Sequence, residues 1–545
     1  MLKSDHWRKL PALMPAIMLV LIVATLAMPV FIELGGSLVI LLETSSGITH
    51  NESFLQSDRI GLLVRSLGIA GFIGLVGVCM GIPLVRVIAI KAPRHRWGAR
   101  LIPAILIAPI WLPAALVYAA GNLLRAPDTI IGKALVAYST SAPDLRWVTI
   151  WAGYVIAVVG LAIWSAPIAG VLIASGLGHR TNLYTEMIAL EPVGLCRRTA
   201  LWVRLHLAIL VRAWVLVTVI MFGSAVPMHL AQLETWSIVI WRQLAESPIE
   251  QWGRIWLSAW PTIFIAGIGA WVLTGPLVRR REESRFEDQG YSLQIVPKLV
   301  ILGAIIVWAL GAMVPMGAML VTLDDWGAIL YFWRIESGAM IDSGLLALAA
   351  GLVVMFVAVL VAITLGNPSR RIRRIGAWAL MILCTLGLIP GVLIGAAVAR
   401  SPIPWMTTGW SGAVLASCIR SAFLGAIIGA LCASSESIER KSIRWQMAGG
   451  SIVGWRRAVM PTITMPLLGA GLIAGLFSMY EIEASVMVRP PGMDNLPQQL
   501  LADLHYARLE QLSAAGINLL GIGLIGSIIA SLLITRIRPA DRFGN

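Results

Sequence analysis

The chain is dominated by long, continuous runs of apolar residues that are separated by short polar segments. A helix needs about 20 apolar residues to cross the hydrocarbon core of a bilayer. Because the runs are continuous and do not alternate with polar residues, they predict helices and exclude the strands of a membrane barrel. The twelve predicted membrane-spanning helices cover residues 11–33, 62–90, 101–122, 147–176, 207–230, 256–278, 297–320, 343–366, 375–399, 409–433, 466–488 and 513–535. The fold class is therefore all-α and polytopic. We expect the first run to be a retained anchor, since it is longer than the apolar part of a signal peptide.

The polar segments between these runs alternate in charge. With twelve spans, 28 of the 42 Lys and Arg residues fall on the side of the N-terminus. They form clusters within 3–9, 91–100, 180–204, 279–298, 370–374, 440–457 and 536–542. The opposite side is rich in acids, including Asp324, Asp325, Glu336, Asp342, Asp494 and Asp503. The excess of positive charge on cytoplasmic loops places both termini in the cytoplasm of a cell (inner) membrane protein.

The composition supports a polytopic membrane protein and argues against a soluble domain or a nucleic-acid-binding protein. Hydrophobic residues make up 58% of the 545 residues and charged residues 13%, whereas a soluble domain has about 25% charged residues. The net charge of +14 is spread over short clusters between spans, so it does not indicate a nucleic-acid surface. Four of the five cysteines (Cys79, Cys384, Cys418 and Cys432) lie in or beside apolar runs. We expect them to be small packing side chains, not disulfide or zinc ligands.

The sequence contains signs of an internal duplication. The segment that begins at Pro113 in the third span resembles the one that begins at Pro390 in the ninth. The pair Arg197-Arg198 precedes the fifth span as Arg456-Arg457 precedes the eleventh. Because six spans separate equivalent positions, we predict two parallel six-helix repeats: a first half over 1–280, a linker over 281–298 and a second half over 299–545.

Motifs for catalysis are missing. The chain has no G-x-x-x-x-G-K-[ST], H-E-x-x-H or G-x-S-x-G pattern. We therefore expect no catalytic residue, no cofactor, no metal site and no ATP hydrolysis by this chain itself. The G-x-x-x-G pairs Gly77/Gly81, Gly425/Gly429 and Gly471/Gly475 predict close helix packing.

Glu481 and Glu483 are the most conspicuous acids, late in the predicted eleventh span. They lie roughly 22 Å of helix beyond Pro466, nearer the outer surface than the midplane. They are candidates for the lining of a translocation path. The simpler interpretation is an interhelical hydrogen bond or an outer mouth that faces water.

Two long cytoplasmic loops, 177–206 and 434–466, carry a resemblance to a known family. The first loop resembles the EAA loop of ATP-binding-cassette (ABC) importer permeases: Glu186 matches the acid of the pattern, with Ala189 and Gly194 as small residues, although Pro192 stands where the pattern has glycine. The second loop lacks the glutamate. Its small residues are Ala448, Gly449, Gly450 and Ser451.

The segment Tyr480–Pro497 contains E-x-x-A, P-P-G and a closing L-P, and it resembles a signature of iron(III)/thiamine-type permeases. Those permeases are also single chains of two fused six-helix halves. The resemblance implies a type I ABC importer fold whose two loops dock on a cytoplasmic ABC ATPase dimer. It also implies an extracytoplasmic substrate-binding protein as a partner, and iron(III) or a related small solute as the substrate.

These observations favour a transport subunit without enzymatic activity, embedded in the lipid bilayer and with no nucleic-acid partner. The alternative is an ion-gradient-driven secondary transporter, which can also have twelve helices in parallel halves. A membrane-embedded enzyme or a scaffold is a third possibility with no motif in its favour.

Overall fold

The computed structural model is helical throughout the part of the chain that it describes. The described residues are 4–44, 57–88, 98–111, 113–123, 130–141, 146–176, 194–231, 233–283, 298–323, 325–407, 409–436, 442–444, 446, 452–488, 492–506 and 508–534. No strand occurs among them.

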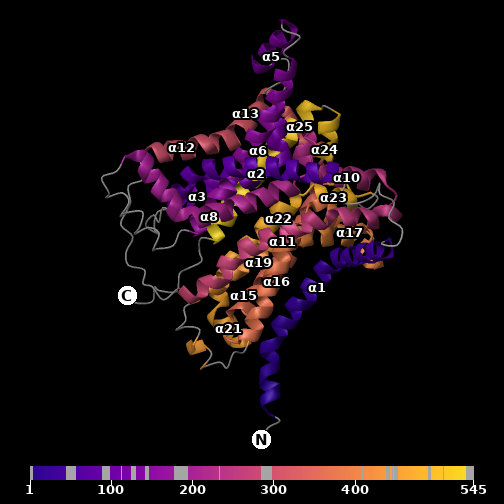
Figure 1. Ribbon diagram of the computed structural model, residues 1–545. Coiled ribbons are helices and arrows are strands. Elements are labelled where there is room, and N and C mark those ends of the chain that lie inside the picture. The colour runs from indigo at the N-terminus through magenta and orange to yellow at the C-terminus, as the bar shows by residue number, and fades with distance from the viewer. Residues whose placement is uncertain are drawn as a thin grey trace.

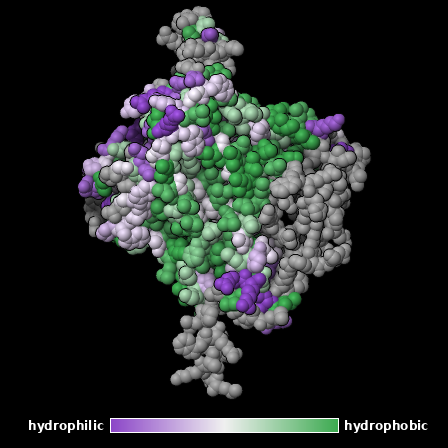
Figure 2. All heavy atoms as spheres, turned by 180° about the vertical axis from the view of Figure 1, so that it is seen from behind, coloured by the Kyte–Doolittle hydropathy of each residue, from purple (hydrophilic) through white to green (hydrophobic). Residues whose placement is uncertain are grey.

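Ten helices within these residues are long and apolar enough to cross a membrane. They cover Leu13–Ile40, Arg59–Val85, Trp151–Ala174, Ala200–Gly223, Ile249–Gly275, Lys298–Val321, Ser337–Gly366, Gly409–Ser434, Met460–Met479 and Leu509–Ile534. A space-filling view shows hydrophobic side chains over the middle of one face, between hydrophilic side chains at the upper left and at the lower end (Figure 2). These features are those of a multi-pass membrane protein.

The elements of the first half begin with a helix that extends well beyond the predicted span. In chain order they are α1 Ser4–Thr44, α2 Ser57–Ile88, α3 Gly98–Ile107, η2 Ala108–Trp111, α4 Ala114–Leu123, α5 Ile130–Ser141, α6 Arg146–Gly176, α8 Leu195–Gly223, α9 Val226–Leu230, α10 Trp236–Glu246, η4 Ile249–Gln251 and α11 Trp252–Glu283 (Figure 1).

The second half begins with a span that contains a short π-helical turn, labelled η5. Its elements are α12 Lys298–Trp308, η5 Ala309–Met313, α13 Val314–Val321, α14 Gly327–Ile335, α15 Ser337–Gly366, α16 Arg370–Leu388, α17 Gly391–Ala399, α18 Pro404–Thr407, α19 Gly409–Ser434, α21 Ile452–Ala458, α22 Met460–Met479, α23 Glu483–Val488, α24 Leu496–His505 and α25 Leu509–Ile534.

Two of the twelve predicted spans are not single straight helices. The run 101–122 is divided into α3, η2 and α4, and α16 and α17 are bent by 100° where the run 375–399 was expected to be continuous. Both breaks end at a proline. The carbonyls of Pro113 and Pro390 each accept hydrogen bonds from the N–H groups three and four residues later, so each proline starts a new helix. The described residues thus contain ten spanning helices, or eleven if the bent pair is one span.

Two further predicted spans end early. The run 207–230 belongs to α8, which stops at Gly223, and the run 466–488 belongs to α22, which stops at Met479. A break of two or three residues follows each helix, and then a short helix, α9 or α23. Glu481 and Glu483 therefore lie at a helix break and not inside a span.

Apart from the short turn η4, the order of elements is the same after both of these spans. The helices α8, α9, α10 and α11 occur in the same sequence of lengths as α22, α23, α24 and α25: long, very short, intermediate and long. The segments that begin at Pro113 and Pro390 are likewise broken at the same proline.

The two halves exchange their first helices. Helix α1 packs against α15, α16 and α17 of the second half, while α12 packs against α2 and α13 against α4. Helices α11 and α16 meet across the halves, as do α25 and α3. The indole Nε1 of Trp308 donates to the carbonyl of Ile105 at 2.7 Å along this boundary. A single apolar core contains buried residues of α1, α2, α6, α8, α11, α15, α16, α17 and α19. One apolar core thus extends across both predicted halves.

The G-x-x-x-G pairs pack as predicted. A Cβ at Gly81 would lie 2.8 Å from the carbonyl oxygen of Ala166, and a Cβ at Gly475 would lie 2.9 Å from that of Ala347. A Cβ at Gly429 would likewise overlap the carbonyl oxygen of Ala358. These glycines allow backbone-to-backbone contact between helices. Of the described cysteines, Cys384, Cys418 and Cys432 are buried and Cys79 is exposed, all with free thiols, as expected.

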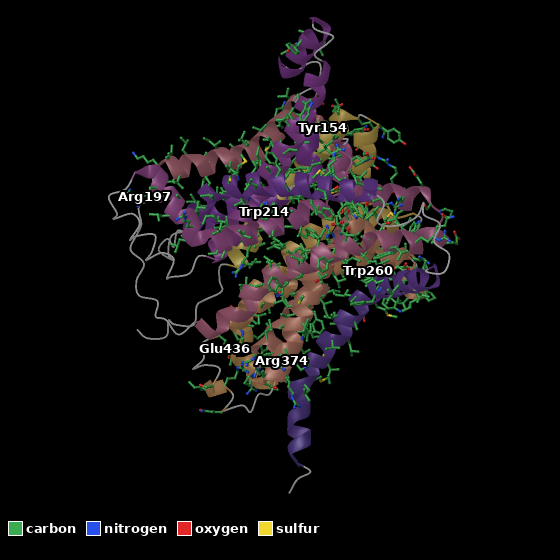
Figure 3. All side chains as sticks on the ribbon, in the orientation of Figure 1. Tyr154, Arg197, Trp214, Trp260, Arg374 and Glu436 are labelled. Atoms are coloured by element: carbon green, nitrogen blue, oxygen red, sulfur yellow. The ribbon has the colours of Figure 1, made fainter. Side chains whose placement is uncertain are left out.

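The helices of the two halves converge at one end of the molecule and diverge at the other. Helices α10, α17 and α23 lie at the converging end (Figure 1). Arg197, in the first turn of α8, and Arg374, in the first turns of α16, lie far apart at the diverging end, with Glu436 near Arg374 (Figure 3).

Candidate functional site

Three helix breaks meet at the converging end of the molecule. They are the breaks between α8 and α9, between α16 and α17, and between α22 and α23. Each break frees N–H and C=O groups that a continuous helix would pair, and unpaired groups of this kind are costly away from water. The polar side chains around the breaks pair with these backbone N–H and C=O groups.

Glu483 supplies the acceptors for two of the helix starts. One carboxylate oxygen, Oε1, accepts hydrogen bonds from the N–H groups of Ala225 at 2.7 Å and Val226 at 3.3 Å, where α9 begins. The other, Oε2, accepts from the N–H of Gly391 at 3.1 Å, where α17 begins. The residue is only 8% exposed. A buried carboxylate with three N–H donors is well satisfied, and its negative charge suits a helix N-terminus.

Arg420, on α19, satisfies the other side of the α16–α17 break. Its Nη1 donates to the carbonyls of Gly387 at 2.6 Å and Ile389 at 2.7 Å. Its Nε donates to Glu481 Oε2 at 3.3 Å, and Glu481 Oε1 accepts from the N–H of Ala484 at 3.2 Å. The guanidinium thus pairs with the last carbonyls of α16 and with one acid of the α22–α23 break.

The packing around these groups leaves no space for larger side chains. A Cβ at Gly391 would overlap Glu481 Oε1 and lie 2.7 Å from Glu483 Cβ. A Cβ at Gly395 would lie 2.6 Å from the carbonyl oxygen of Ala484. Helices α17 and α23 are therefore in direct backbone contact, and Glu481 and Glu483 are held in fixed positions between them.

The structure brings both predicted acids into one network, and their contacts are interhelical hydrogen bonds, the simpler of the two interpretations. Arg420 is the partner that sequence reasoning did not single out. Its signal is an arginine in the middle of an apolar run, which is a functional candidate in any membrane-spanning segment. The pairing of Arg420 with carbonyls of α16 depends on the tertiary fold and has no trace in the sequence.

Within the Tyr480–Pro497 segment, Asp494 and Leu496 bond to the start of α15. Gly492 has φ 82°, a left-handed conformation that favours glycine. The N–H of Asp494 donates to Asp342 Oδ2 at 3.2 Å, and the N–H of Leu496 donates to Ser343 Oγ at 2.8 Å. These two bonds fix the chain at the start of α24.

Several acids gather beside this segment. Burial, together with the negative charges of Asp503 and Asp494, raises the pKa of Glu336. Gln499 Nε2 donates to Glu336 Oε1 at 3.3 Å. Among the described residues, no group of three or more His, Cys, Asp or Glu side chains is arranged to hold a metal ion.

Most of the predicted coupling-loop residues cannot be placed. Glu186, Ala189, Ala448, Gly449, Gly450 and Ser451 lie outside the described residues. Gly194 is described: it is exposed and precedes the first residue of α8, with its carbonyl accepting from the N–H of Arg198 at 3.0 Å.

A buried ion pair lies near the start of the second loop. Arg444 Nε and Nη2 donate to the two oxygens of Glu436 at 2.8 and 2.9 Å. The side chains are 5% and 8% exposed. This two-bonded geometry ties residue 444 to the segment that follows α19.

The chain was compared with known proteins at the levels of family, sequence and structure. No protein-family model matches it, and no curated protein or solved structure is significantly similar to it.

Proposed function

We propose that this chain is the membrane-spanning permease subunit of an ATP-driven ABC importer. The observation that carries the proposal is the common order of broken helices in the two halves. In each predicted half, a segment that resembles a coupling loop runs into the long helix, α8 or α22, that leads into a break and three further helices. This repetition is what a duplicated transporter with one ATPase contact per half would show.

The count of crossings supports the same topology. If α3, η2 and α4 together make one broken crossing, as α16 and α17 do, the chain crosses twelve times. Twelve crossings would put both termini and both loops, 177–206 and 434–466, on the same side of the membrane, and the basic clusters favour the cytoplasmic side. Broken helices are tolerated in a membrane where other parts of the protein satisfy their backbone groups, as Glu483 and Arg420 do.

In this proposal the chain forms the path and does no chemistry itself. A separate cytoplasmic ATPase dimer hydrolyses ATP and moves the two halves relative to each other through the two loops. A substrate-binding protein delivers the solute to the outer side. Iron(III) is the first substrate to test, because the Tyr480–Pro497 segment resembles that of iron(III)/thiamine-type permeases.

Co-purification tests the coupling loops. The full chain would be purified in mild detergent together with its cytoplasmic ATPase subunit, as wild type and as Glu186→Arg and Gly450→Arg. Matched controls make the same changes in the linker, at Glu287 and Gly290. We expect both loop variants to lose the ATPase subunit and both linker variants to keep it, because a long cation prevents close approach of a docking helix. Retention of the subunit by both loop variants would refute the coupling-loop assignment.

One observation keeps a second candidate function open. Buried acids and an arginine at broken helices are also what an ion-coupled secondary transporter uses to bind its coupling ion. The two candidates differ in energy source. With ferric iron as the probe, uptake that stops on ATP depletion and survives an uncoupler favours the ABC importer, and the reverse pattern favours the secondary transporter.

A further inference from the structure

We propose that Glu483 is a latch between the two halves, which holds the outer end of the translocation path closed and is released when the path opens outward. The proposal rests on the function proposed above, which makes the converging end of the helices the outer end. Its basis is the set of partners of Glu483: Ala225 and Val226 belong to the first half, and Gly391 belongs to the second.

The first half depends on this contact because its own break offers no acid. Ser224 and Ala225 follow the end of α8, and Val226 begins α9. The N–H groups of Ala225 and Val226 are paired by a carboxylate from the other half, in a region where Ala225 and Val226 are 0% and 2% exposed. Separation of α9 from α23 would leave both N–H groups without acceptors until water entered. The contact therefore favours a dry, closed state.

The contacts of the neighbouring acid, Glu481, show which helices stay together with Glu483. The carboxylate of Glu481 accepts from Arg420 and from the N–H of Ala484, both in the second half. Gly391 and Gly395 hold α17 against α23 at backbone distance. Helices α17, α19 and α23 thus form one body that includes Glu483. The surface at which the halves can separate lies between Glu483 and the start of α9.

The arrangement of the helices is consistent with a closed latch. The helices converge at α23, which begins at Glu483, and diverge toward Arg197 and Arg374 (Figures 1 and 3). A transporter that exposes its path alternately to the two sides must reverse this arrangement. The hydrogen bonds from Ala225 and Val226 to Glu483 are interactions that the reversal must break.

Thiol labelling measures the opening directly. The reporter is Val226→Cys, which is buried against Ile482 and Ala115 in this structure, in a chain whose five natural cysteines are replaced by alanine. The purified full chain in lipid nanodiscs, without an ATPase, would be treated with a membrane-impermeant maleimide. We expect Glu483→Gln to raise the labelling rate about tenfold, as for the loss of one hydrogen bond to a charged group. Glu234→Gln, which makes the same change at an acid that is 54% exposed, is the control and should leave the rate unchanged.

Two additions keep the result decisive if a variant folds poorly. A second reporter, Ala422→Cys on α19, is 0% exposed within the second half and should stay unlabelled in every variant. Glu483→Asp keeps the charge but shortens the reach to α9, so it should also raise labelling of Val226→Cys. Equal labelling in the Glu483 variants and wild type, an equal rise in Glu234→Gln, or labelling of Ala422→Cys would overturn the latch. Because no ATPase is present, these outcomes are independent of the coupling-loop test.

Discussion

At the scale of single residues, the buried charges of this protein are explained by the backbone groups that they satisfy. Burial of an ion away from water is costly unless it is paired and fully hydrogen-bonded. Glu483 meets that condition with three N–H donors, and Arg420 meets it with two carbonyls and Glu481. These residues stabilise broken helices and do not by themselves indicate catalysis.

The pair of Arg420 and Glu481 gives a test of this explanation. Arg420→Ala leaves the carbonyls of Gly387 and Ile389 and a buried Glu481 without their partner. We expect a loss of about 3–5 kcal/mol in the free energy of unfolding, as for other broken buried ion pairs. Thermal unfolding of the purified chain in detergent measures it.

The control for that measurement is an exposed pair. Arg242 and Glu234 form an ion pair at 3.4 Å in which both side chains are 54% exposed. Arg242→Ala should change the unfolding free energy by about 1 kcal/mol or less. If the two arginine variants unfold alike, the buried network does not stabilise the breaks.

At the scale of elements, hydropathy predicted where helices lie but not where they break. Apolar runs gave the approximate positions of all the spans, because crossing a bilayer needs a fixed length of apolar chain. The breaks at Pro113 and Pro390 fall within such runs. Proline alone does not mark a break, since Pro83, Pro167 and Pro466 lie inside unbroken helices.

The broken helices differ from the unbroken ones in the tertiary contacts that satisfy their backbone groups. At Pro390, Arg420 donates hydrogen bonds to the carbonyls before the proline, and Glu483 accepts a hydrogen bond from the N–H after it. The break at Ser224 has no proline within it and is paired by a residue more than 250 positions away in the chain. Such partners cannot be identified from one sequence, although the acids and the arginine within apolar runs were visible there.

Glycine contacts between helices give a second test, at this scale. Gly429→Ala places a methyl group against the carbonyl of Ala358, so α19 and α15 must move apart. Overpacking of this kind costs about 1–3 kcal/mol. Gly344→Ala, on α15 with open space around it, should be neutral or stabilising by up to about 1 kcal/mol. Thermal unfolding of the two variants should therefore shift in different directions, and a similar shift in both would contradict the packing role of Gly429.

At the scale of the whole molecule, composition and charge fixed the class more firmly than any motif. A chain with 58% hydrophobic residues and basic clusters in alternate loops can be stable only in a membrane. The exchange of α1 and α12 between the halves, and the convergence of the three breaks, depend on packing and could not be predicted. The coupling loops were predicted from residue patterns, and that assignment remains the central prediction.

The most direct test of this central claim is the ATP hydrolysis of the complex in proteoliposomes. The chain would be purified with its ATPase subunit, and phosphate release would be measured with and without vanadate. We predict vanadate-sensitive hydrolysis for the wild type and for the linker control Gly290→Arg, and none above background for Gly450→Arg. Absence of an ATPase from the wild-type complex, or undiminished hydrolysis by Gly450→Arg, would contradict the account.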